Sequence, residues 1–182
     1  MSNRTDFVLK TLQVVAWILF VGLCIDAGGM LSNTLYSIFI NESLASHFWN
    51  NNNLSQLLSF NQATYVTLTT LMSIVTILKA ILFYIIVKIF HDKKLNLSDP
   101  FKEAMSPFIS NIAFVSLAIG LFSLWGTNLS DGVLNQNIVL PSVQKLKLGG
   151  ADVWIFMGFI LLIFAKIFKK GIELQSENDL TV

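Results

Sequence analysis

The chain has 182 residues, of which 54% are hydrophobic and only 13% are charged, and its formal net charge is +1. Soluble domains carry about 25% charged residues, so this composition excludes an ordinary soluble domain and predicts an integral membrane protein with the lipid bilayer as a partner. The near-neutral charge gives no reason to expect direct binding of nucleic acid.

The first apolar run covers about residues 12–31 and contains one acidic residue, Asp26. A helix rises about 1.5 Å per residue, so this run can cross a hydrocarbon core about 30 Å thick. Gly22, Asp26, Gly29 and Asn33 recur every three or four positions, which gathers them on one helix face. We expect this face of small and polar groups to look toward other helices rather than toward lipid.

The second apolar run covers residues 65–90, and its only charges are Lys79 and Lys88. Lys88 lies close enough to one end to extend toward the headgroups, whereas Lys79 lies nine residues further in. Three residues of this run follow helical spacing as a polar stripe: Thr69, Ser73 and Thr76.

Lys79 and Asp26 together predict an intramembrane charge pair. A charge buried in a bilayer is costly, so such residues are functional or paired with one another. One interpretation is a fixed salt bridge that orients two helices. Another is a switch or site at which a proton, an ion or a ligand competes for the pair. The third is no contact, with Asp26 near water and Lys79 bonded to Thr76 or to backbone carbonyls.

Two further apolar runs complete the pattern. Residues 108–125 contain no charge and end before Gly126, residues 153–168 are strongly apolar, and a polar tail follows over 171–182. The sequence therefore predicts an all-α fold: a single four-helix transmembrane domain over residues 1–182, with connections that are polar or charged.

Lysine and arginine are distributed unevenly among the segments that flank the apolar runs. The two connections at 41–64 and 128–152 hold only Lys145 and Lys147. The other three flanking segments hold nine: Arg4, Lys10, Lys88, Lys93, Lys94, Lys102, Lys166, Lys169 and Lys170. By the positive-inside rule, this asymmetry predicts that both termini and the tail are cytoplasmic.

Catalytic and metal-binding patterns are missing from the sequence. The two histidines, His47 and His91, are predicted on opposite sides of the membrane, which excludes a two-histidine metal site within one chain. No phosphate-binding glycine loop is present. We therefore expect no enzymatic activity, no cofactor and no metal.

The turn Asp99-Pro100-Phe101 and the ending G-I-E-L-Q-S-E-N-D-L-T-V resemble the YoaS-like family, a domain-of-unknown-function group of small four-helix bacterial inner-membrane proteins. The resemblance implies a multi-pass protein of the bacterial inner membrane. Genes of that family neighbour a small helix-turn-helix regulator, which implies a cytoplasmic DNA-binding partner that contacts the tail. The implied contact residues are Glu177, Asn178, Asp179, Leu180, Thr181 and Val182.

Three functions fit these observations. The first is a non-enzymatic membrane sensor or regulator that acts on such a transcription factor. The second is a small oligomeric channel or carrier with a polar path near Asp26 and Lys79. The third is a structural subunit of a larger membrane assembly. The small-residue faces also suit association into a homo-oligomer.

Overall fold

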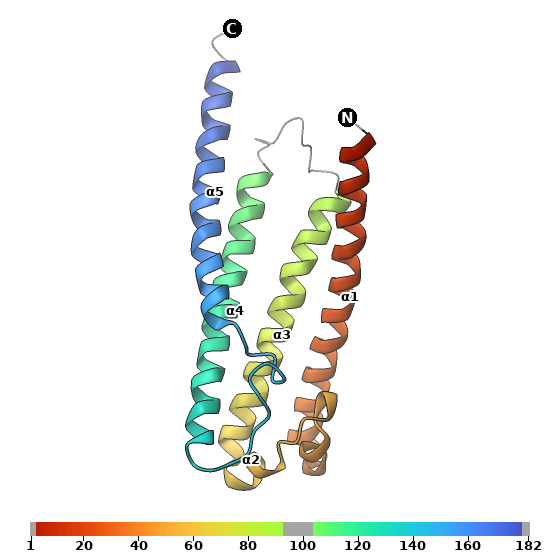
Figure 1. Cartoon of the computed structure of the whole chain (residues 1–182), viewed down its shortest axis with the longest axis vertical. Coiled ribbons are helices and arrows are strands. Elements are labelled where there is room, and N and C mark those ends of the chain that lie inside the picture. Colours follow the sequence, from red (N-terminus) through yellow and green to blue (C-terminus); the bar gives the residue numbers. More distant parts are fainter. Residues whose placement is uncertain (1–2, 93–103, 180–182) are drawn as a thin grey trace.

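Four long helices dominate a computed structural model that describes residues 3–92 and 104–179 (Figure 1). They are α1 (Asn3–Phe39), α3 (Gln62–His91), α4 (Met105–Leu134) and α5 (Ala151–Asp179). Each helix contains a stretch that is long and apolar enough to cross a membrane. The described residues form no β-strand, which confirms the predicted all-α membrane fold. The Asp99-Pro100-Phe101 turn lies outside the described residues.

The four helices pack in a row rather than around a common axis. Helix α1 packs against α3, α3 against α4, and α4 against α5, so α1 and α5 lie at the two ends (Figure 1). The end helices leave large apolar side chains exposed, including Ile18 on α1 and Phe156 on α5. Because lipid solvates such surfaces, this exposure suits helices that border a bilayer.

Helix α4 extends past Gly126, the point at which the sequence suggested an end. A Cβ at Gly126 would lie 2.7 Å from Leu148 Cδ1, so glycine lets the Leu148 side chain pack closely against the helix. Helix α5 likewise extends through residues 171–179, the first part of the expected tail. Glu173, Leu174 and Gln175 are good helix formers, so the polar composition does not stop the helix.

The two connections opposite the chain ends fold together into a structure that we call the cap, residues 40–61 and 135–150 (Figure 1). Its first half contains η1 (Glu42–His47), η2 (Trp49–Asn51) and α2 (Ser55–Phe60). The second half contributes Leu146 and Leu148, which are fully buried in the same apolar core as Phe48, Leu54 and Leu57. The cap is therefore part of the folded domain.

Asparagines shape the cap. Asn50, Asn51 and Asn137 have positive φ angles of 58°, 56° and 62°, a conformation that asparagine adopts more readily than most residues. The side chain of Asn53 accepts hydrogen bonds from Ser55, and Asn61 caps the start of α3 by accepting from the Thr64 N–H. The run Asn50–Asn53 is thus a set of turn and capping residues.

Buried hydroxyl groups join α1 to α3. Thr34 and Ser73 place their hydroxyl oxygens 3.0 Å apart, and the Tyr65 hydroxyl donates to Ser37 Oγ at 2.8 Å. Ser37 in turn donates to the Thr34 carbonyl. The hydroxyl groups of this interface therefore bond to one another or to backbone, as polar groups between membrane helices do.

Replacing Tyr65 with phenylalanine is expected to lower the free energy of unfolding by about 1 kcal/mol, the usual contribution of one hydrogen bond. The ring still fills its buried site, so the bond to Ser37 is the main loss. Chemical unfolding in detergent micelles measures the change. Tyr84→Phe on the exposed side of α3 is the matched control, and an equal effect of both substitutions would contradict this assignment.

Candidate functional site

Asp26 of α1 contacts both halves of the cap. Its Oδ2 accepts a hydrogen bond from Lys147 Nζ at 2.8 Å, which is also an ion pair, and its Oδ1 accepts from Trp49 Nε1 at 3.1 Å. The side chains of Asp26 and Lys147 are 24% and 34% exposed, so the pair is partly buried. A single carboxylate therefore ties α1 to loops that are far apart in the sequence.

Lys79 of α3 contacts the same loop. Its ammonium donates to the backbone carbonyl of Lys147 at 2.8 Å. It also lies 5.9 Å from the ring centroid of Trp154, near the start of α5, in a cation–π arrangement. We call Asp26, Trp49, Lys79, Lys147 and Trp154 the charged cluster.

Asp26 and Lys79 do not form the direct ion pair that the sequence suggested, and each of them instead binds Lys147. Asp26 binds the side chain of Lys147, and Lys79 binds its backbone carbonyl. The physical reason is that residues 142–148 fold back onto the helices, which places an ammonium closer to Asp26 than Lys79 is. Lys79 finds a carbonyl instead, as the third interpretation anticipated, although Asp26 is not left to water.

Lys147 has an unusual backbone conformation. Its φ angle is 63°, in the left-handed region that costs a residue with a Cβ on the order of 1 kcal/mol. Hydrogen bonds hold it there, because the Lys147 N–H donates to the Gln144 carbonyl and the Leu148 N–H to the Val143 carbonyl. Buried Leu146 and Leu148 anchor both sides. Strained residues held by several contacts are frequent at functional sites.

The residues of the two predicted polar faces lie in different environments. Gly29 faces the ring of Trp49, where a Cβ would not fit, and this close approach allows the indole to reach Asp26. Thr69 and Ser73 lie in the α1–α3 interface, where Thr34 Oγ1 donates to the Thr69 carbonyl. Three members do not bridge the helices: Gly22 faces open space, Asn33 donates to the Gly29 carbonyl, and Thr76 bonds to carbonyls of its own helix.

The chemistry that the charged cluster offers is electrostatic. Two ammonium groups face one carboxylate, so the cluster carries one excess positive charge. Within residues 3–92 and 104–179, no group of three or more His, Cys, Asp or Glu side chains could hold a metal ion. The absence of enzymatic activity and of a cofactor stays a prediction.

Helix α5 leads away from the cap, so its last residues lie at the end of the molecule that carries the chain termini (Figure 1). Glu177 is exposed near the end of α5, which continues through Asn178 and Asp179. Leu180, Thr181 and Val182 lie outside the described residues.

The sequence analysis missed Trp49, Lys147 and Trp154. No local pattern pointed to Lys147, because the alternation Leu146-Lys147-Leu148 is typical of an extended segment, whereas the structure forms a turn there. Trp49 had no clear signal either, since it stands between Phe48 and a run of four asparagines.

The comparisons with known proteins give a family but no function. A family model described as "Protein of unknown function (DUF2975)" matches residues 49–182. The match includes Trp49, Lys79, Lys147 and Trp154, whereas Asp26 precedes it. No curated protein and no solved structure matches the chain. Because the model covers well over half of its residues, the chain belongs to the DUF2975 family of proteins of unknown function.

Proposed function

We propose that the chain is a YoaS-like, non-enzymatic sensor or regulator of the bacterial inner membrane that acts on a small cytoplasmic helix-turn-helix transcription factor. The observation that supports a sensor best is the position of Lys147. Its side chain binds Asp26 of α1, its carbonyl binds Lys79 of α3, and Lys79 also contacts Trp154 of α5. A change in the cap thus reaches three transmembrane helices through one residue.

The distribution of charge supports a cap on the outer side and chain ends in the cytoplasm. Within the cap, Lys145 and Lys147 are the only Lys or Arg residues, and the ammonium of Lys147 is neutralised by Asp26. Cytoplasmic segments of membrane proteins carry the excess of Lys and Arg. The cap is therefore the part that would meet an external signal.

Helix α5 provides the physical route from the cluster to the cytoplasm. It begins at Ala151, beside Trp154, and continues without a break through Asp179 (Figure 1). A long helix moves as a rigid element, so a displacement near Trp154 would also displace the tail. Such coupling requires two arrangements that differ in their contacts, and the Lys79–Trp154 contact is the one we expect to differ.

The polar stripes give less support to a channel or carrier. The hydroxyls of Thr34, Ser37, Tyr65 and Ser73 are buried and bond to one another between α1 and α3. Hydroxyl groups whose hydrogen bonds are made within the interface favour a packed, water-free contact between the helices over a water-filled path.

Affinity capture from gently solubilised membranes tests the proposal, with the full-length chain compared with one truncated after Lys170. We expect the full-length chain to retain a small DNA-binding protein and the truncated chain to lose it. Residues 171–177 lie at the exposed end of α5, so the truncation should leave the helix row intact, and an unchanged unfolding temperature in detergent is the control. Equal capture by both forms, or no soluble protein with either, would count against the regulator.

A further inference from the structure

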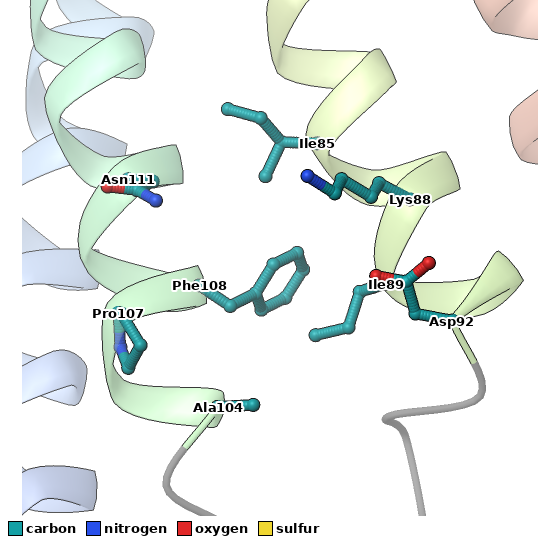
Figure 2. A pocket seen from close by; sticks show the side chains of 8 residues that line it. All are labelled: Ile85, Lys88, Ile89, Asp92, Ala104, Pro107, Phe108 and Asn111. Atoms are coloured by element: carbon teal, nitrogen blue, oxygen red, sulfur yellow. The ribbon is translucent and has the colours of Figure 1, made fainter.

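A cavity of about 330 Å³ lies between α3 and α4 (Figure 2), where α3 ends and α4 begins, and these helix ends lie opposite the cap (Figure 1). Ile85, Ile89 and Phe108 form apolar walls, and Lys88, Asp92 and Asn111 supply the polar groups. The cavity lies near the end of α3 and the start of α4. It is therefore at the depth where a transmembrane helix meets the lipid headgroups.

Lys88 and Asn111 are available to a ligand. Figure 2 shows the Lys88 side chain extending from α3 toward α4, with its ammonium facing the side of the cavity that carries Asn111. Within the described part of the chain, neither the ammonium nor the amide is in a hydrogen bond or an ion pair. Asp92, the C-cap residue that follows α3, also lines the cavity and has an interaction of its own.

The start of α4 adds positive potential to this site. Ala104 and Pro107 line the cavity, and the N-cap residue Ala104 has no side chain that could accept from the first N–H groups of the helix. The first turn of α4 contains no acidic residue. The N–H groups at a helix start favour anions. Pro107 has no N–H and the Phe108 N–H donates to the Ala104 carbonyl, so the start of α4 adds less to the site than the charge of Lys88 does.

We propose that this cavity binds the phosphate of an anionic membrane phospholipid. The Lys88 ammonium and the Asn111 amide donate to phosphate oxygens, and the lipid chain lies along Ile85, Ile89 and Phe108. Basic pockets between transmembrane helices bind anionic headgroups by this chemistry. The apolar walls and the headgroup depth favour a lipid over a soluble phosphate. The inference rests on the cavity alone and is independent of the proposed function.

Lipid titrations of the purified full-length chain in detergent, read by native mass spectrometry, test the site. The probes are phosphatidylglycerol and phosphatidylcholine with identical acyl chains. We expect the chain to prefer phosphatidylglycerol and Lys88→Gln to weaken its binding about tenfold, the effect of losing one charge-assisted hydrogen bond. Lys10→Gln, which removes an exposed lysine from α1 outside the cavity, is the matched control and should bind like the wild type.

Asn111→Leu removes the amide with little change in volume, so it tests the site through a second residue and should also weaken phosphatidylglycerol binding. Equal affinity for the two lipids, wild-type binding by Lys88→Gln and Asn111→Leu, or an equal loss in Lys10→Gln would overturn the proposal. Soluble glycerol phosphate should not displace the lipid. Displacement at concentrations comparable to the lipid would assign the site to a soluble phosphate instead.

Discussion

Replacing Asp26 with asparagine is expected to lower the free energy of unfolding by about 1–3 kcal/mol, a range between the effects of exposed and fully buried ion pairs. The substitution removes the charge that neutralises Lys147 but retains an oxygen that can accept from Trp49 Nε1. Chemical unfolding in detergent micelles measures the loss. The size of the effect reflects a pair whose side chains are only 24% and 34% exposed.

The same substitution should loosen the cap selectively. Without its ion pair, Lys147 loses one of the contacts that hold its left-handed backbone, so hydrogen–deuterium exchange should rise over residues 142–148. Glu42→Gln, which removes an exposed negative charge from the cap, is the matched control. Equal exchange in the two variants would show that charge in the cap, rather than the specific contact, sets its stability.

Replacing Gly120 with alanine should destabilise the chain by about 1–3 kcal/mol, as overpacking does in other close-packed interiors. A Cβ at this position would lie 2.5 Å from Ile155 Cγ1 and 2.8 Å from the Ile155 backbone nitrogen. A flexible side chain can move aside, but the backbone of α5 cannot, so the two helices must separate. Unfolding in detergent micelles again measures the effect.

Gly132→Ala provides the control on the same helix. Nothing lies within 4 Å of the Cβ that this substitution would add. Because alanine favours a helix over glycine, we expect Gly132→Ala to stabilise α4 by up to about 1 kcal/mol. If both substitutions destabilise the chain to the same degree, the close approach of α4 and α5 at Gly120 is wrong.

The transmembrane helices could be predicted because the bilayer imposes a length and a composition on each of them. The ends of the helices were harder to predict. Gly126 resembled a terminator, but its role is to admit Leu148, which is a contact between distant segments. Residues 171–179 were expected to be a tail, and helix formers continue α5 through them instead.

Only Asp26 and Lys79 of the charged cluster were predicted from the sequence, because the other members depend on contacts between distant segments. Asp26 and Lys79 could be identified from the sequence because burying a charge in an apolar helix costs free energy, whichever residue is its partner. Lys147 is an ordinary residue for a loop, and its contact with Asp26 spans 121 positions of the chain. That contact depends on how residues 142–148 fold back onto the helices, which no local pattern encodes.

A double-mutant cycle between Asp26 and Lys147 tests most directly whether their contact joins the cap to the helices. Unfolding free energies are compared for Asp26→Asn, Lys147→Gln, the double variant and the wild type, all in the same detergent. Glutamine avoids the extra backbone freedom that glycine would add at φ 63°. We predict a coupling energy of about 1–2 kcal/mol, within the range for residues in contact. Additive effects, with a coupling below about 0.5 kcal/mol, would contradict the contact.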